Sequence, residues 1–236
     1  MRRYPASRSN GPRALGVSGI VNLYKFCRRE HLDAFFSDGQ IHLGTPRSYR
    51  AEEGGGSMVA DPFEGVKRIR GEIPDLTAET IKKYPALSGI MAVRGGGRVH
   101  IRLENIDVSY EDVYIFSCSS EYSKEVHQQW RLSEEYDACY RIRLPADFFR
   151  AISEVVADKA TFLGYRCVVY YDSDTGLDVH SPLAGIHPAC LKGGKNFGPQ
   201  TEVRAFWKPR AHGDVKPFVL YAPEAIQYCE HHAVLS

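Results

Sequence analysis

The residues best suited to chemistry lie in a short run near the C-terminal end, Gln200-Thr201-Glu202-Val203-Arg204. Alternate side chains of an extended strand point to the same face, so Gln200, Glu202 and Arg204 would share one face. A carboxylate between an amide and a guanidinium could stabilise positive charge that develops in a bound substrate. The same spacing also fits a cross-strand ion pair on a solvated face, and the pattern alone leaves both interpretations open.

Two earlier segments place hydroxyls and cations near the ends of expected strands. Tyr24-Lys25-Phe26 lies on the first strand, and Thr45-Pro46-Arg47-Ser48-Tyr49 follows the second. Either segment could hold a polar ligand, and either could equally be an edge strand with ordinary turn residues. After these two segments, the sequence Asp61-Pro62-Phe63-Glu64-Gly65 is typical of a turn, in which Asp initiates the turn and Pro fixes the backbone.

Two further groups have both a functional and a plain interpretation. Gly193 and Gly194 lie between Lys192 and Lys195, which could bind an anion through backbone N–H groups and ammoniums or form a solvated loop. Cys27 precedes two arginines that would favour a thiolate. Its inward position on the expected strand instead favours a buried, unreactive thiol.

Cysteine and histidine spacing argues against metal chemistry. The six cysteines form no CxxC pair, and the nine histidines form no HExxH or mixed Cys/His ligand pattern. The chain also lacks a Walker phosphate loop and a GxSxG nucleophile elbow. We therefore expect no metal site, mostly reduced cysteines and no phosphate-binding loop of the Walker type.

Charge is balanced over the chain but uneven along it. Its 236 residues carry 30 Lys+Arg and 29 Asp+Glu, so the formal charge is +1. This value excludes a protein that coats nucleic acid through net charge alone. Residues 1–19 hold four arginines and no acid, which predicts a flexible basic arm of charge +4, and residues 20–236 sum to −3. Arginines at 68–70 and 94–102 could contact phosphates or be scattered surface charge.

Hydrophobic periodicity predicts a mixed α+β domain over residues 20–236, with many short strands and few helices. The expected strands are residues 20–27, 40–44, 99–103, 113–118, 138–144, 165–171, 201–207 and 218–221. The expected helices are residues 29–37, 77–84, 120–132 and 146–157. Residues 172–200 would form a long connection of the kind that often covers a binding site. Without a signal sequence or an apolar span, the expected location is the cytoplasm, away from membranes.

Taken together, the motifs resemble a broad bacterial family of uncharacterised proteins. The shared features, in order, are LYKF at 23–26, GQIHLGTP at 39–46, DPFEG at 61–65, FSCSSE at 116–121, Trp130 and QTEVRAFW at 200–207. The resemblance runs from about residue 20 to about residue 210. Ala60 stands where that family usually has Asn, and Gln200 stands where many members have Glu.

That family in turn resembles the ADP-ribosyltransferase superfamily, which implies a core of two packed, mostly antiparallel sheets of short strands. On this resemblance Gln200 and Glu202 form the catalytic Q-x-E element. Residues 45–49 take the place of a Ser-Thr-Ser motif, and Tyr24 or Lys25 that of a first-strand His or Arg. No Ser-Thr-Ser sequence is present here.

The resemblance implies that NAD is the substrate and that no metal is required. Loss of nicotinamide from NAD leaves an oxocarbenium-like ribose, which Glu202 would stabilise. Tyr49, Phe63 or Trp130 would stack on the nicotinamide ring. Arg47, Lys25 or Arg204 would hold the pyrophosphate. Together with Thr45, Ser48 and Tyr24, these residues make up the expected NAD site.

The resemblance leaves open whether the enzyme is an ADP-ribosyltransferase or an NAD glycohydrolase of the same fold, which only hydrolyses NAD. For a transferase, the acceptor of ADP-ribose is open between protein and RNA or DNA. The resemblance suggests a toxin in bacterial or phage conflict, with an antitoxin or immunity partner as a possible companion. A non-catalytic module that binds nucleic acid or a partner protein on the same fold is the main alternative. A nuclease that uses Mg²⁺ at Asp61, Glu64 and Glu202 is a third reading, although their spacing matches no nuclease pattern.

Overall fold

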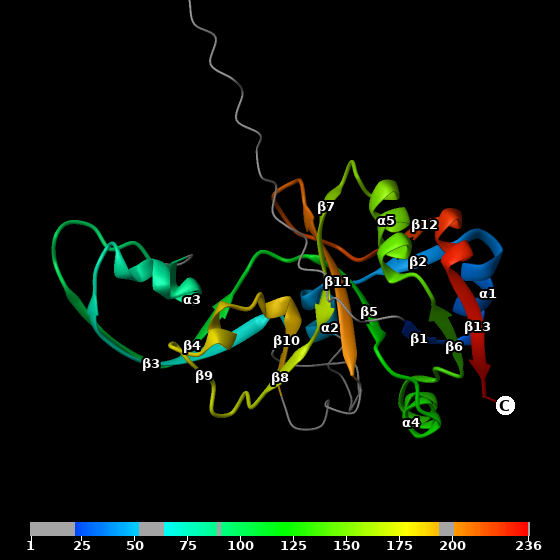
Figure 1. Cartoon of the computed structure of the whole chain (residues 1–236), viewed down its shortest axis with the longest axis horizontal. Coiled ribbons are helices and arrows are strands. Elements are labelled where there is room, and N and C mark those ends of the chain that lie inside the picture. The colour runs from blue at the N-terminus through cyan, green and yellow to red at the C-terminus, as the bar shows by residue number, and fades with distance from the viewer. Residues whose placement is uncertain (1–21, 52–63, 89–90, 194–200, 236) are drawn as a thin grey trace, which may run out of the picture.

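A six-stranded antiparallel sheet forms the body of the computed structural model, in the order β13-β6-β1-β5-β11-β7 (Figure 1). The structure describes residues 22–51, 64–88, 91–193 and 201–235. The strands of this sheet are β13 (Cys229–Val234), β6 (Ala138–Ile142), β1 (Leu23–Cys27), β5 (Tyr114–Ser119), β11 (Glu202–Pro209) and β7 (Ala160–Cys167).

The main hydrophobic core lies on one face of this sheet. It is covered by α1 (Arg29–Asp38), α5 (Pro145–Val155), the 3-10 helix η5 (Pro223–Tyr228) and the two-stranded sheet of β2 (Gln40–Leu43) and β12 (Phe218–Tyr221). The apolar positions of α5 recur at helical spacing, and Phe148, Phe149 and Ile152 are fully buried. Gly39 ends α1 in the left-handed conformation, with φ of 74°, where a side chain would strain the backbone.

Helix α4 (Lys124–Glu134) lies against the opposite face of the sheet. Ser123 caps it by accepting a hydrogen bond from the backbone N–H of Val126 at 3.1 Å. The ring of His127 packs 5.1 Å from that of Phe26 on β1. This contact positions Trp130, one turn later on α4, beside the same strand.

The six-stranded sheet has a weak seam between β1 and β5. The two strands share a single residue pair, Tyr24 with Ser119, whereas β1 pairs with β6 over its whole length. Beyond that pair, the side chain of Lys25 spans the seam and donates a hydrogen bond to the carbonyl of Ser117 at 2.8 Å. The sheet therefore consists of two three-stranded halves that meet through little backbone pairing.

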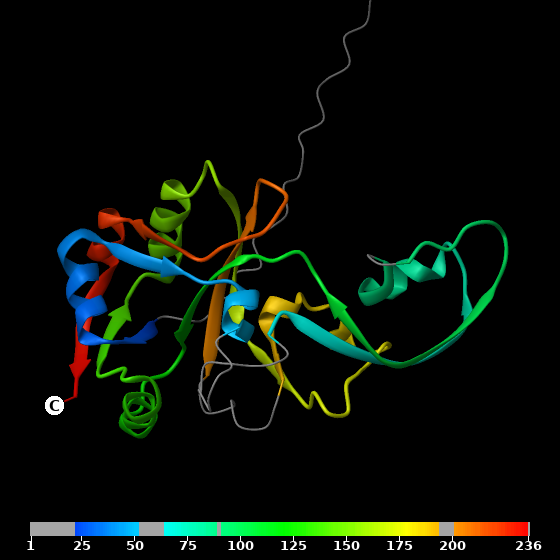
Figure 2. The same cartoon turned by 180° about the vertical axis from the view of Figure 1, so that it is seen from behind.

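A second lobe extends away from this sheet, as Figures 1 and 2 show. It contains the long antiparallel pair β3 (Val66–Leu76) and β4 (Val99–Ser109), with β9 (Leu177–Asp178) parallel to β3. The hairpin bends at Gly71, where the pairing register shifts. Its inner side has a hydrophobic core of its own, covered by η1 (Thr80–Lys83), α3 (Pro85–Ser88) and η2 (Pro182–Gly185).

Four short elements join the two lobes. They are α2 (Pro46–Ala51), η3 (Pro188–Cys190) and the two parallel strands β8 (Val169–Tyr171) and β10 (Leu191–Gly193). The small cluster of Ile115, Ala189, Cys190 and Phe206 packs at this junction.

The predicted α+β class is confirmed, and most sheets are antiparallel, although the strands of the described residues divide among four sheets. Most predicted elements are present within a few residues of their expected bounds. The predicted helix at 77–84 is instead a 3-10 turn followed by α3, because reciprocal hydrogen bonds between Thr77 and Thr80 tighten its start. Strands β3 and β13 and helix α2 were not anticipated.

The connection at 172–200 is not a bare loop, since its described part holds β9, η2, η3 and β10. The predicted basic arm at 1–19 lies outside the described residues. Within the described part of the chain, no helix is long and apolar enough to cross a membrane.

Candidate functional site

Strand β11 holds Glu202 and Arg204 on one face and Val203 and Ala205 in the main core on the other. Its neighbours β5 and β7 cover both edges of the strand. Glu202 is 8% exposed and Arg204 only 2% exposed. The alternative of a solvated surface ion pair is therefore wrong, because both charged groups are buried between the two lobes.

Arg204 bonds two carboxylates at once. Its Nε donates to Glu202 Oε1 at 2.6 Å, and its Nη2 donates to Glu202 Oε2 at 3.2 Å. Its Nη1 and Nη2 also donate to the two carboxylate oxygens of Glu64, the Nη2 bond measuring 2.9 Å. A fifth bond runs from Nη1 to the carbonyl of Ala189 at 2.9 Å. All the donors of this guanidinium fork are thus directed at protein oxygens.

Lys192 on β10 approaches Glu202 from the other side, with its Nζ 3.4 Å from Oε2. Burial by itself would raise the pKa of Glu202. The charges of Arg204 and Lys192, together with hydrogen bonds from Arg204 and Ser117, outweigh burial and lower that pKa from 4.5 to about 2. Glu202 is therefore an anion at any physiological pH.

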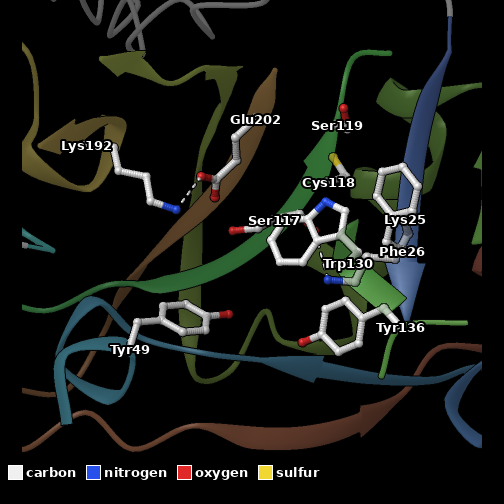
Figure 3. A pocket seen from close by; sticks show the side chains of 10 residues that line it. All are labelled: Lys25, Phe26, Tyr49, Ser117, Cys118, Ser119, Trp130, Tyr136, Lys192 and Glu202. Atoms are coloured by element: carbon white, nitrogen blue, oxygen red, sulfur yellow. Dashed lines mark hydrogen bonds and ion pairs between the residues drawn. The ribbon is translucent and has the colours of Figure 1, made fainter. Parts of the chain in front are cut away.

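Glu202 lines a cavity of about 90 Å³ whose opposite wall is aromatic (Figure 3). The Trp130 ring stacks on Tyr136 at 5.6 Å and on Phe26 at 6.4 Å between centroids. Figure 3 shows the hydroxyls of Tyr49 and Tyr136 pointing into the cavity from opposite sides. The full lining is Lys25, Phe26, Tyr49, Ser117, Cys118, Ser119, Trp130, Tyr136, Lys192 and Glu202.

Tyr49 reaches this cavity from α2, and Gly44 makes room for it. A Cβ atom at Gly44 would lie 2.5 Å from the Tyr49 hydroxyl and 2.7 Å from its Cζ. Burial raises the pKa of Tyr49 well above its usual value, so its hydroxyl stays protonated. The cavity therefore contains a permanent hydrogen-bond donor opposite a permanent anion.

Lys25 lines the same cavity through the seam between β1 and β5. Its Nζ lies 4.8 Å above the Phe116 ring and bonds the Ser117 carbonyl. Burial is the largest influence on this amine, and it lowers the pKa of Lys25.

A larger cavity of about 420 Å³ adjoins the first. The two share Lys25, Phe26, Tyr49, Ser117 and Tyr136 in their linings. The polar side chains that only the larger cavity contacts are His31, Gln40, His42 and Glu134. Its volume falls in the usual range for sites that hold cofactor-sized ligands.

Of the expected NAD-site residues, the structure brings Lys25, Tyr49, Trp130 and Glu202 together around one cavity. Arg204 supports Glu202 from behind and is fully engaged by carboxylates, so it has no donor left for a pyrophosphate. This corrects the pyrophosphate role expected for Arg204.

Four expected residues lie elsewhere. Tyr24 faces Tyr122 and His232, because alternation along β1 turns it away from Lys25. Thr45 and Ser48 bond each other's backbone N–H groups at 3.0 and 3.1 Å and so cap α2. Arg47 pairs with Asp214 at 2.9 Å beside a different cavity. Their expected contacts with NAD are therefore not supported.

Gln200, Phe63 and Asp61 lie outside the described residues. Lys192, Ser117 and Tyr136 were not predicted as part of the Glu202 site. Glu64 was grouped with Glu202 only in the Mg²⁺ nuclease alternative, and its bonds to Arg204 were not predicted. Glu64 lies in the DPFEG motif and Lys192 in the Lys192–Lys195 segment, but no sequence pattern linked either residue to Arg204.

Among the described residues, no group of three or more His, Cys, Asp or Glu side chains is arranged to hold a metal ion. Comparison with family models, curated proteins and solved structures finds no match to this chain.

Proposed function

We propose that this protein is an ADP-ribosyltransferase that cleaves NAD at the nicotinamide–ribose bond and transfers ADP-ribose to a macromolecular acceptor. One observation carries the proposal: the Glu202 carboxylate, with a pKa of about 2, faces a stacked aromatic wall across a small cavity. The proposal includes the fold: we propose that the core has the two packed sheets of an ADP-ribosyltransferase.

The chemistry needs a fixed negative charge beside the sugar. When nicotinamide leaves, positive charge develops on C1 and the ring oxygen of the ribose, and a preorganised carboxylate stabilises it. Two N–H bonds from Arg204 fix the orientation of the Glu202 carboxylate, so little reorganisation is needed during the reaction. Lys192 contacts the carboxylate at 3.4 Å, a longer distance than the Arg204 bonds, and both Lys192 and Glu202 line the cavity.

The aromatic wall suits the leaving group. Nicotinamide is a flat ring that carries positive charge in NAD, and it would stack on Trp130 or Tyr136. The first cavity is too small for a dinucleotide, so the phosphates and adenosine would extend past Lys25 into the larger cavity.

The acceptor is a protein or a nucleic acid in this proposal, and the setting is bacterial or phage conflict in the cytoplasm, with an antitoxin as a possible partner. The two arginine-rich segments belong to one hairpin, β3–β4. Arg68, Arg98 and Arg102 pair there with Asp107, Asp75 and Glu104. These pairs weaken the attraction of the hairpin for phosphate, which favours a protein acceptor.

A non-catalytic binding module is the second candidate, and the ion pairing of Glu202 favours it. Both oxygens of this carboxylate already accept bonds from Arg204, and Lys192 contacts one of them. A carboxylate used only for structure would look similar. The same bonds argue against a Mg²⁺ nuclease, because Arg204 occupies both Glu64 and Glu202.

The test is to incubate the protein with labelled NAD and cell extract and to measure nicotinamide release and label transfer. The matched pair of variants is Glu202→Gln and Glu104→Gln, the latter an exposed carboxylate on β4. We expect Glu202→Gln to abolish both signals and Glu104→Gln to keep them. Equal turnover in the two variants would exclude Glu202 as the catalytic group. Calorimetry that detects no NAD binding would favour the binding module.

A further inference from the structure

Lys25 presents a partly buried amine to the cavity that contains Glu202. Among the residues that the structure describes, its Nζ has one hydrogen-bond acceptor, the Ser117 carbonyl at 2.8 Å, and lies over the Phe116 ring. No carboxylate of the described residues lies within ion-pair distance of it, whereas Lys192 contacts Glu202. Lys25 therefore differs from Lys192, because among the described residues its acceptor is a neutral carbonyl and not a carboxylate that would hold its proton.

The surroundings of Lys25 favour the neutral amine, which is the nucleophilic form. Burial removes the ammonium from water and lowers the pKa of Lys25. The neighbouring thiols of Cys27 and Cys118 are themselves kept protonated by burial, so they supply little negative charge. Glu202 is the nearby anion, but Arg204 already neutralises it.

Groups that could move protons surround the same space. The hydroxyls of Tyr49 and Tyr136 point into the cavity beside the Lys25 amine (Figure 3). Burial raises the pKa of Tyr49, so its hydroxyl stays protonated and can donate a hydrogen bond to a carbonyl oxygen. A carbonyl compound bound there would meet a nucleophile and a hydrogen-bond donor that polarises its carbonyl group.

We propose that Lys25 is a covalent site for an aldehyde, and that its ligand is the open-chain form of ADP-ribose. This step rests on the proposed function: when water takes the place of the macromolecular acceptor, cleavage of NAD in the cavity releases ADP-ribose, whose C1 opens to an aldehyde. The Nζ lone pair attacks C1 and the carbonyl oxygen takes up a proton, which gives a carbinolamine. Loss of water then gives the imine, so one amine and one aldehyde yield one imine and one water, with no change of oxidation state.

The consequence is a self-limiting enzyme. The imine would hold ADP-ribose across both cavities and exclude the next NAD until water reverses the bond. Lys67 provides an internal control, since burial lowers its pKa to about 8 but its Nζ donates to the carbonyls of Ala184 and Ile186 outside this cavity. If a lowered pKa were sufficient for imine formation, Lys67 would also react with ADP-ribose; if the cavity is required, Lys67 would stay unmodified.

The experiment supplies ADP-ribose directly to the full-length protein with cyanoborohydride, which reduces the imine to a stable amine, and locates the adduct by peptide mass spectrometry. We expect the adduct at Lys25, with Lys67, Lys192 and the exposed lysines Lys82 and Lys83 unmodified. Lys25→Arg should reduce total adduct at least about tenfold, because a guanidinium forms no stable imine of this kind. The site distribution is read in the wild-type protein, so the result does not depend on the folding of the variant.

A parallel reaction with NAD separates the two proposals. Adduct at Lys25 from ADP-ribose, with no nicotinamide released from NAD, would retain the aldehyde site and overturn NAD cleavage. Nicotinamide release without any adduct at Lys25 from ADP-ribose would overturn the aldehyde site and retain NAD cleavage. Adduct spread over the exposed lysines, with Lys25 unmodified, would also overturn the site.

Discussion

Glu64 and Glu202 accept hydrogen bonds from the same guanidinium, that of Arg204, although one precedes β3 and the other begins β11. Arg204 thus bonds the base of the extended lobe to the six-stranded sheet, at the junction where the short elements also join the two lobes. The orientation of the candidate catalytic carboxylate depends on a residue at the base of the other lobe.

Removing Glu64 should be costly. Glu64→Ala leaves a buried guanidinium with half of its carboxylate partners, and loss of one partner from a buried ion pair costs about 3–5 kcal/mol. The measurement is the free energy of unfolding in urea. The control is Asp214→Ala, which breaks the exposed Arg47 pair and should cost about 1 kcal/mol or less. Similar losses in the two variants would contradict the importance of the buried pair.

Stability should fall in acid partly through Glu202. Its pKa in the folded protein is about 2, below the ordinary 4.5, so its ionised form stabilises the fold above pH 4.5 and this contribution disappears as pH falls towards 2. The contribution is on the order of 3 kcal/mol at neutral pH. Urea unfolding of wild type and Glu202→Gln should differ most at pH 7 and converge below pH 3. A difference that is constant with pH would contradict the lowered pKa.

A methyl group at Gly44 should disturb the cavity through Tyr49. Gly44→Ala places a Cβ 2.5 Å from the Tyr49 hydroxyl, so the ring must move, at a cost of about 1–3 kcal/mol. Thermal unfolding and nicotinamide release should both decline. Gly96→Ala is the matched control, since nothing lies within 4 Å of the added atom. In a Tyr49→Ala background the cost of Gly44→Ala should vanish, and its persistence would show that another contact is responsible.

Ligand binding should be visible in tryptophan fluorescence. The chain has two tryptophans, of which Trp207 is fully buried in the main core and Trp130 lines the cavity. Nicotinamide stacked on Trp130 should quench its emission, and Trp130→Phe should remove the quenching while Trp207 still emits. Quenching of equal size in Trp130→Phe would place the ligand away from the aromatic wall.

The sequence predicted the local part of this site and missed the long-range part. Alternation along β11 predicted that Glu202 and Arg204 share a face, because that property depends only on neighbouring residues. Their burial depends on Glu64, at the base of the second lobe, and on Lys192, on β10 at the junction of the lobes, and no local pattern encodes that packing. Strand β3 was missed, and β4 was predicted only over residues 99–103, because their charged residues resemble exposed loop sequence.

The position of Lys25 shows most clearly what strand alternation cannot predict. Strand alternation groups it with Leu23 and Cys27, both of which are in the main core, so the pattern gives it no access to the Glu202 cavity. It gains that access because β1 and β5 pair at only one position. How far two strands pair is decided by the whole sheet and not by either strand's own sequence.

That single pair of Tyr24 with Ser119 gives the sheet a hinge-like line through its middle. Each half, β13-β6-β1 and β5-β11-β7, is fixed internally by several consecutive pairs, whereas the described backbone pairing between the halves is one pair, supplemented by the Lys25 hydrogen bond and by packing in the main core. Lys25, Phe26, Trp130 and Tyr136 contact the cavity from one side, and Ser117, Lys192 and Glu202 contact it from the other. The width of the cavity thus follows the opening of the sheet, and a ligand that joins its two walls would stiffen the whole body of the protein.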